Sequence, residues 1–453
     1  MEHRKRQDAV LDACSREVHQ FGKRRISRRQ FVQSSGSIVA AGALLGKRAF
    51  AAPRPLKIGY VSPETGPLAP FGEADSFVIG TIRKKLQGGI MSGGAARPIE
   101  ILVRDSQSST NRAAEVAASL IKSDKVDLVL VAGAPDTVNP VADQCEINQV
   151  PCISTEMPWE SFLFHHSGSP GKGFDWIYHF FWSAELISQV TVDMCDLVPT
   201  NKVVGCLWGN DIDGNLFADP VHGHTPAFVA RGYKVIDPGR FPLDTNDFSA
   251  QISTFKKANA EIVHGVIPFP TFSNFWAQAA QQDYKPKVAV IGKALLFPSG
   301  PTALGPRGKN LTCEVWWSHN FPFKSSLTAQ SARQLCDAYE EATKREWTQA
   351  LGFRHALFEV GLDAFKRAQN PESAASVIGA VRTTRLNTVV GPIQWQGSPP
   401  NRWSQIPFKN SCTTPLVAGQ WVPGKKWPYE IVVVDNRRYP LIPVERKEQP
   451  LPA

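Results

Sequence analysis

The sequence of 453 residues lacks several motifs that carry enzyme chemistry. It has no CxxC pair, which argues against a thioredoxin-like redox motif and a cysteine zinc site. It has no GxSxG nucleophile elbow. The glycine-rich stretch Gly168–Gly173 (GSPGKG) lacks the four-residue gap and the following Ser or Thr of a phosphate loop. No activated nucleophile or acid–base pair stands out, so we expect a protein that is not an enzyme and uses no cofactor.

Long apolar runs are also absent, since outside the N-terminus none approaches the about 20 residues that cross a bilayer. Residues 1–51 instead combine the paired Arg28 and Arg29, a short apolar stretch at Ser35–Gly46 and the small Ala51. This order resembles a twin-arginine export signal. It implies that residues 1–51 are removed on export and that the mature protein is periplasmic.

The net positive charge is small once that segment is set aside. The formal net charge is +9, but residues 1–51 hold eleven Lys and Arg against four Asp and Glu, which leaves about +2 for the remainder. This balance argues against a nucleic-acid partner. The histidine pairs His165–His166 and His222/His224 have no acidic or cysteine residue at ligand spacing, so we predict no metal site.

Seven cysteines remain beyond residue 51, an odd number that leaves at least one unpaired. Cys145 and Cys152 lie in neighbouring elements, as do Cys195 and Cys206, so each pair is within reach of a disulfide. The alternative is that all are buried thiols packed as small hydrophobes. The sequence leaves both interpretations open.

The most informative stretch is a strand, a helix and a second strand. Asp127–Gly133 (DLVLVAG) is an apolar run typical of a strand buried on both faces. The turn Ala134–Thr137 then opens a helix, and Val150–Ser154 is the next strand, closed by a polar turn that ends at Trp159. Such βαβ units are right-handed, and ligands bind at the carboxyl ends of their strands. Both polar turns are therefore predicted at the binding edge.

The pattern repeats along the chain. Strands are predicted at 56–62, 99–105, 202–209 and 261–268, and a strand plus loop at 287–297, with helical segments between them. The predicted fold class is α/β, with two doubly wound Rossmann-like lobes joined by a multi-strand hinge. The predicted division is lobe I at 53–182 plus 318–392, lobe II at 183–317 plus 393–436, and a C-terminal tail at 437–453.

The order of elements and several loops resemble a known family. The segments concerned are LKIGYVSPETGPLAPFGE (56–73), DSQSSTNRAAEVAASLI (105–121), VDLVLVAGAPDTVNPVADQCEINQVPCIS (126–154), YHFF (178–181) and TVVGPIQW (388–395). Together they resemble the Leu/Ile/Val-binding family of type I periplasmic substrate-binding proteins of ABC transporters. The resemblance implies two lobes that close on one small molecule, a monomer, and delivery of the ligand to a membrane permease.

The resemblance also implies a ligand site. An aromatic in the first loop covers the ligand, the helix start after the turn at 134–137 holds its carboxylate, and the turn at 154–158 binds the same end. Three loops of the second lobe close over it. Independently of the resemblance, Trp159, Trp208 and Trp276 lie near predicted loops, where their rings either stack on a ligand or pack at the lobe edges. The predicted contacts are Phe71, Asp136, Thr137, Ser154, Thr155, Glu156, Trp159, Trp208, Asp213, Phe269 and Lys293.

One loop departs from the family pattern. Amino-acid binders commonly place an acidic residue near Lys293 to hold the ammonium group, but this loop reads GKALLF. Lysine repels an ammonium, although Asp213 is a possible substitute. The ligand is thus an amino acid, an amide or urea-like compound, or an aromatic compound. An alternative function is a ligand-sensing receptor domain of the same fold, but we find no signalling module in the sequence.

Overall fold

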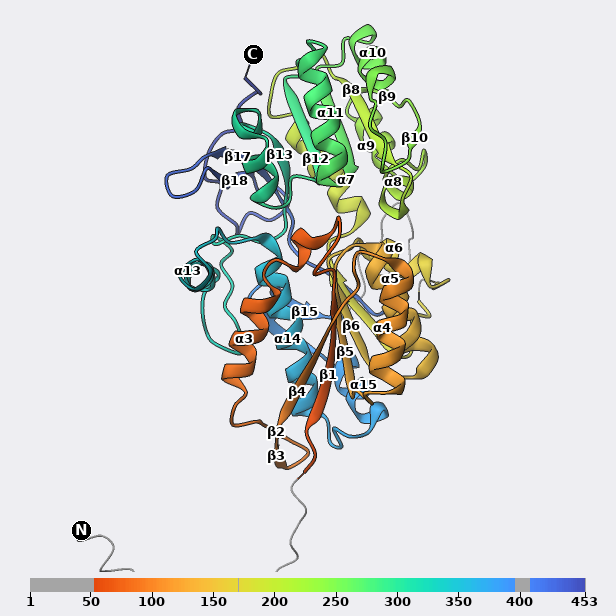
Figure 1. Ribbon diagram of the computed structural model, residues 1–453, viewed down its shortest axis with the longest axis vertical. Helices are drawn as coiled ribbons and strands as arrows, with labels where there is room; N and C mark the ends of the chain where they lie inside the picture. The colour runs from red at the N-terminus through yellow and green to blue at the C-terminus, as the bar shows by residue number, and fades with distance from the viewer. Residues whose placement is uncertain (1–52, 170, 396–407, 453) are drawn as a thin grey trace, which may run out of the picture. The chain divides into compact units, whose positions relative to one another are not determined.

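The computed structural model describes residues 53–169, 171–395 and 408–452 (Figure 1). The chain from Arg54 onward forms one compact unit. The predicted export signal at 1–51 lies outside the described residues. No helix in the described ranges is both long and apolar enough to cross a membrane.

The first sheet has six strands in the order β16-β7-β6-β5-β1-β4, and all its pairs are parallel. In β5, Leu128 and Leu130 belong to the apolar cluster that includes α14, while Val129 and Val131 belong to the cluster that includes α4 and α5. Helices therefore cover both faces (Figure 1). The strands are β1 Leu56–Ser62, β4 Ile99–Asp105, β5 Leu128–Ala132, β6 Cys152–Thr155, β7 Ile177–Phe181 and β16 Ser411–Thr413. The helices are α3 Asp75–Lys85, α4 Thr110–Lys122, α5 Pro135–Asn148, α6 Trp159–His165, α14 Gln349–Arg367 and α15 Ala374–Arg382.

The second sheet has eight strands in the order β10-β8-β11-β12-β13-β17-β18, with β9 beside β8. Its pairs are parallel as far as β13 and antiparallel from β13 to β18. The strands are β8 Val203–Gly209, β9 Lys234–Ile236, β10 Arg240–Phe241, β11 Ile262–Ile267, β12 Val288–Lys293, β13 Thr312–Val315, β17 Val417–Pro423 and β18 Tyr429–Asp435. The helices are α7 Ala184–Cys195, α8 Ile212–Phe217, α9 His224–Ala230, α10 Ser249–Lys257, α11 Phe269–Gln281 and α12 Ser299–Ala303.

Smaller elements connect and border these sheets. Two hairpins pair β2 with β3 and β14 with β15. The helix α13 begins with a capping box formed by Ser331 and Gln334. The bounds are η1 Ala69–Gly72, β2 Ile90–Ser92, β3 Ala95–Arg97, η2 Gly305–Gly308, α13 Ala332–Thr343, β14 Arg385–Thr388 and β15 Gly391–Gln394.

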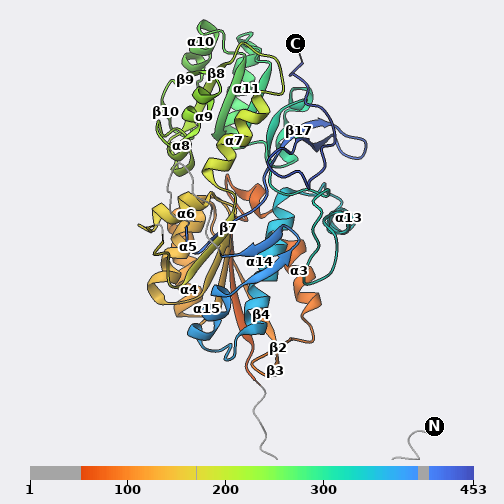
Figure 2. The same ribbon diagram turned by 180° about the vertical axis from the view of Figure 1, so that it is seen from behind.

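Within the described residues the chain passes between the two sheets three times, after β7, after β13 and after β16 (Figures 1 and 2). This confirms the predicted α/β class with two lobes. The strand β16 lies in the range 393–436 predicted for lobe II, but it pairs with β7 of the first sheet. A three-residue strand carries too little local pattern to reveal its partner. The tail after 437 packs on the second sheet, where Leu451 N donates to Lys287 O at 2.8 Å.

All seven cysteines of the described residues are buried and free. Cys145 and Cys152 pack in the apolar cluster between α5 and the first sheet, and Cys195 and Cys206 pack in the large cluster that extends through the second lobe. The structure agrees with the interpretation of buried thiols and not with the two disulfides considered above.

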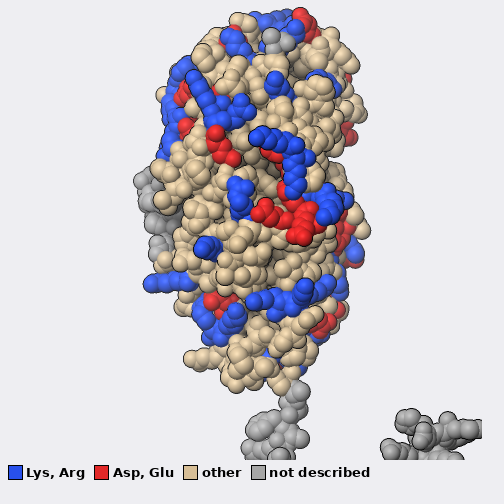
Figure 3. Space-filling model, turned by 90° about the vertical axis from the view of Figure 1, so that its left-hand side faces the viewer, with Lys and Arg blue, Asp and Glu red and all other residues tan. Residues whose placement is uncertain are grey.

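The face that carries α13 shows basic and acidic side chains interspersed (Figure 3). Nucleic-acid-binding proteins instead gather Lys and Arg on one face. The surface drawn in Figure 3 is therefore in keeping with the small net charge beyond residue 51.

Gly352 in α14 and Gly379 in α15 form a matched pair for testing the packing. A Cβ on Gly352 would lie 2.3 Å from Cδ2 of the buried Trp317, whereas a Cβ on Gly379 meets nothing within 4 Å. We expect Gly352→Ala to lower the free energy of unfolding by about 1–3 kcal/mol, the usual cost of overpacking. Gly379→Ala is expected to raise it by about 0.5–1 kcal/mol through helix propensity. Urea unfolding of both variants checks this, and equal shifts would contradict the packing of α14.

Candidate functional site

A small cavity lies where the strand ends of the two lobes meet. It has a volume of about 30 Å³, room for one or two water molecules. The first lobe contributes Ala134 from the turn after β5 and Glu156–Pro158 from the turn after β6. The second lobe contributes residues at the ends of β11, β12 and β13 and from α8. The two polar turns expected at the binding edge thus face one shared cavity, and the lobes meet side chain against side chain.

Arg354 of α14 organises the first-lobe side of this region. Its guanidinium is buried and donates to Tyr60 Oη at 2.8 Å and to the Phe71 carbonyl at 2.9 Å. It also makes ion pairs with Glu156 Oε2 at 2.9 Å and with Asp75 Oδ1 at 3.6 Å. One buried arginine therefore ties β1, the first loop, α3 and the turn after β6 together.

Glu156 lines the cavity with an unusual backbone and an unusual charge state. Its φ is +74°, a left-handed conformation that costs energy for a non-glycine residue. Its Oε2 lies 2.9 Å from Arg354 Nη2, while Oε1 accepts no hydrogen bond from a described residue. Burial raises the pKa of Glu156 to about 8, against the opposing Arg354 charge and with the help of Asp75. Strain and perturbed ionisation together are typical of a functional position.

Lys293, at the end of β12, is the corresponding cation of the second lobe. Its Nζ lies 2.7 Å from Asp211 Oδ2 and 2.7 Å from Asp213 Oδ2. Asp211 also caps α8, because its Oδ1 accepts from Gly214 N at 2.7 Å. Burial raises the pKa of Asp213 to about 6, although the Lys293 charge lowers it. The positive charge of Lys293 is thus matched within its own lobe.

Glu314 of β13 and a histidine pair complete the second-lobe lining. Burial raises the pKa of Glu314 to about 7, and the Asp213 charge adds to this. His264 Nδ1 donates to Val290 O at 2.8 Å, so its Nε2 accepts from His224 Nδ1 at 2.7 Å. Burial lowers the pKa of His264 to about 4, which keeps this ring neutral at pH 7.

Four of the predicted contacts line the cavity: Phe71, Glu156, Asp213 and Lys293. Phe269 lines an adjacent cavity of about 200 Å³, which shares Phe71 and Lys293 with the first. Asp136 lies in the first turn of α5, where burial raises its pKa while the Lys293 charge lowers it. Asp136 is therefore close enough to Lys293 of the second lobe to feel its charge.

The other predicted contacts use their side chains inside their own lobe. Thr137 Oγ1 donates to Ala134 O at 3.1 Å, and Ser154 and Thr155 donate to carbonyls of β7. Trp159 packs on Phe408 with 4.2 Å between ring centroids, and Trp208 packs edge-on against His224 and His264. These residues support the lining rather than form it, and their contact with a ligand stays a prediction.

Sequence reasoning missed Arg354, Glu314 and the aromatic lining residues Trp182 and Trp316. The only signal for Arg354 was an arginine within an apolar helical run, GFRHALFEV, because a buried arginine needs a partner. Glu314 is likewise a charged residue within an apolar element, the strand β13. Their spatial neighbours lie far away along the chain, so spacing alone gave no ligand set.

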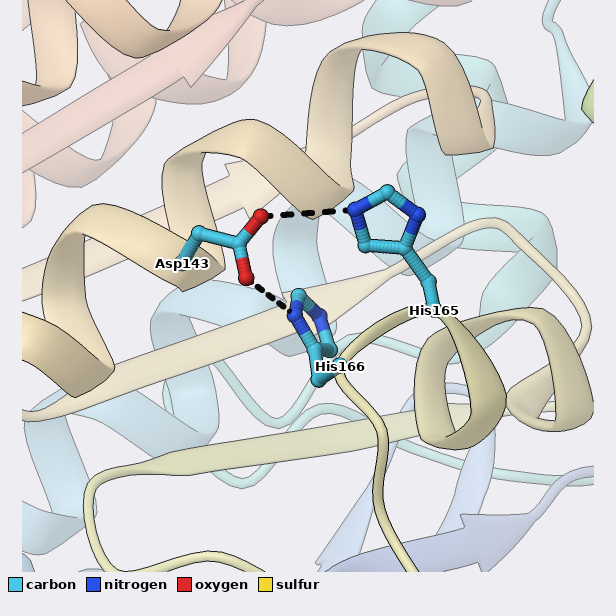
Figure 4. A group of neighbouring side chains, drawn as sticks. All are labelled: Asp143, His165 and His166. Carbon is cyan, nitrogen blue, oxygen red and sulfur yellow. Dashed lines mark hydrogen bonds and ion pairs between the residues drawn. The ribbon is translucent and has the colours of Figure 1, made fainter.

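A second polar cluster lies on the first lobe outside the cavity lining (Figure 4). Asp143 of α5 accepts from His166 Nδ1 at 2.6 Å and from His165 Nε2 at 3.3 Å. Asp143 is the acidic neighbour of the two histidines that sequence spacing did not reveal. One potential metal-ligating atom from each of the three side chains lies within 4.8 Å of the other two. Partial burial works against ionisation of Asp143, but the hydrogen bond from His166 lowers its pKa. Two hydrogen bonds account for this arrangement.

The chain was compared with known proteins. A family model described as periplasmic binding protein matches residues 55–403. No curated protein sequence matches the chain.

Solved structures share the fold at low sequence identity. The leucine-binding protein LivK of Thermotoga maritima is 19% identical with a TM-score of 0.65, covering 84% of this chain and 99% of its own. The substrate-binding protein LivJ of Streptococcus pneumoniae, solved with isoleucine, is 16% identical with a TM-score of 0.65, covering 84% and 100%. A solute-binding protein of Rhodopseudomonas palustris, solved with 3,4-dihydroxybenzoic acid, is 17% identical with a TM-score of 0.63, covering 83% and 95%.

Proposed function

The chain belongs to the periplasmic binding protein family, and from that premise we propose that it captures one small molecule between its lobes and delivers it to the permease of an ABC transporter. The observation that carries the proposal is the convergence of charged side chains from both lobes on one cavity. Strand ends that meet across a hinge are the usual place for a ligand in open α/β sheets.

The small volume of the cavity indicates how capture would proceed. With about 30 Å³ available, a ligand enters only when the lobes separate. It would dock first on the turns after β5 and β6, and the second lobe would then bring Asp213 and Lys293 over it. Closure follows binding only if the ligand favours the closed form. The three passages of the chain between the sheets would serve as the hinge.

The proposal also covers the location of the protein, its division into lobes and the classes of ligand. We propose that residues 1–51 are a twin-arginine signal, that the mature protein is a periplasmic monomer, and that lobe I and lobe II follow the predicted division with β16 moved to lobe I. The candidate ligands are an amino acid, an amide or urea-like compound, or an aromatic compound. The relatives solved with isoleucine and with 3,4-dihydroxybenzoic acid support this range without choosing within it.

Native mass spectrometry of the protein purified from its host is the direct test. We expect a single small molecule bound at one per chain, lost on denaturation, together with a mass that lacks the N-terminal segment. The control is the same protein after unfolding and refolding, which should be ligand-free and should bind the identified compound again. A protein that carries nothing and binds no solute from an extract of its growth medium would contradict the proposed function.

A further inference from the structure

We propose that the ligand is a small organic cation, with an amidinium, guanidinium or ammonium group and no carboxylate beside it. This inference rests on the proposed function and specifies its ligand. It departs from the zwitterionic amino acids that the family resemblance suggested.

The balance of charge around the cavity favours a cationic ligand. Arg354 is held by Asp75 and Glu156, and Lys293 is held by Asp211 and Asp213. Each cation therefore already has two carboxylates, and neither is free to pair with a ligand carboxylate. Among the described lining residues Lys293 is the one side chain with a fixed positive charge, against the carboxyl groups of Glu156, Asp213 and Glu314. A ligand with a positive charge favours the ionised form of these carboxyl groups and is attracted to it, whereas an anion is repelled by it.

The cavity also offers buried carboxyl oxygens that can accept hydrogen bonds from a ligand. Glu156, Asp213 and Glu314 are 3%, 4% and 5% exposed. Oε1 of Glu156 and Oδ1 of Asp213 accept no hydrogen bond from a described residue. Glu314 lines the same cavity, and the hydrogen bond from its own backbone N–H leaves its carboxyl group able to accept from further donors. Buried acceptors without donors are costly. Amidinium, guanidinium and ammonium groups supply only donors, so they satisfy these oxygens.

The wall of the cavity is aromatic on one side. Phe181, Trp182 and Trp316 line it, with ring centroids 4.7 Å apart for Phe181 and Trp182 and 5.2 Å apart for Phe181 and Trp316. Aromatic faces attract organic cations, and the attraction grows when water is excluded. The indole N–H groups of Trp182 and Trp316 have no acceptor among the described residues, so they are neutral donors for an uncharged acceptor on the ligand. The adjacent cavity of about 200 Å³ leaves room for the apolar part of a ligand.

Three probes of nearly equal shape separate the charge classes: benzamidine is a cation, benzamide is neutral and benzoate is an anion. Calorimetry of the ligand-free mature chain at pH 7.5 is expected to show benzamidine bound at least tenfold more tightly than benzamide, and benzoate not bound. Guanidinium and methylammonium extend the series to cations without a ring. Benzamide or benzoate bound as tightly as benzamidine overturns the inference, and so does failure of all three cations to bind.

Variants test whether the carboxylates make this choice. Glu314→Gln keeps the shape of the side chain and is expected to reduce the preference for benzamidine over benzamide at least tenfold. Glu346→Gln is the matched control, because Glu346 is also buried but does not line the cavity. It should leave the preference unchanged. An unchanged preference in Glu314→Gln overturns the role of this carboxylate.

The result for the ligand class is distinct from the result for the function. A neutral, anionic or zwitterionic compound that co-purifies and rebinds overturns the cation inference and leaves solute capture intact. A protein that binds no compound of any charge overturns both.

Discussion

Replacement of Arg354 with Met is expected to lower the free energy of unfolding by about 3–5 kcal/mol, the usual cost of breaking a buried ion pair from one side. Arg354 is fully buried, and its removal leaves Asp75 and Glu156 without their cation and Tyr60 without its donor. Methionine fills a similar volume, so the loss reports the uncompensated charge rather than a cavity. Urea unfolding followed by tryptophan fluorescence measures the change.

Two further variants isolate that cause. Arg112→Met removes a surface pair with Glu115, whose side chains are 39% and 67% exposed, and should cost less than about 1 kcal/mol. Combining Arg354→Met with Asp75→Asn and Glu156→Gln removes the orphaned charges and should recover most of the loss. A triple variant as unstable as Arg354→Met alone would show that packing, not charge, is the role of Arg354.

Replacement of Glu314 with Gln is expected to stabilise the protein at pH 8 and to have little effect near pH 4.5. The pKa of Glu314 is raised from 4.5 to about 7 by burial, so between these values the folded state holds a proton that the unfolded state has lost. Stability therefore falls as the pH rises through this window. The full cost of ionising the buried Glu314 is roughly 3 kcal/mol, at about 1.36 kcal/mol for each pKa unit. This cost is present above pH 7. Glutamine removes it.

The measurement is the difference in unfolding free energy between Glu314→Gln and the parent protein at several pH values. The difference is needed because other groups titrate in the same range. Burial raises the pKa of Glu156 to about 8 and that of Asp213 to about 6, which acts in the same direction. Burial lowers the pKa of His264 to about 4, which makes stability rise with pH below 6.5. A difference that does not change between pH 4.5 and pH 8 would contradict the buried state of Glu314.

Only part of the candidate site could be predicted from the sequence. The turns after β5 and β6 could be placed at the binding edge because the order strand, turn, helix fixes where a turn lies. Glu156 and Asp213 were found through such turns and line the cavity. Arg354 could not be assigned in the same way, since its contact with Tyr60 spans 294 residues along the chain. Lys293 was identified, but its partners Asp211 and Asp213 were not recognised as neutralising it.

The sequence by itself determined the α/β class, the two-lobed plan and the polar turns, because buried runs, helix periodicity and turn residues are local signals. Only the tertiary structure decided that β16 joins the first sheet and that Arg354 and Lys293 are each held between two carboxylates. It also decided that the buried Glu314 is paired with neither of these cations. These facts depend on which distant segments pack together, and charge balance in a cavity is a property of that packing rather than of any one stretch of chain.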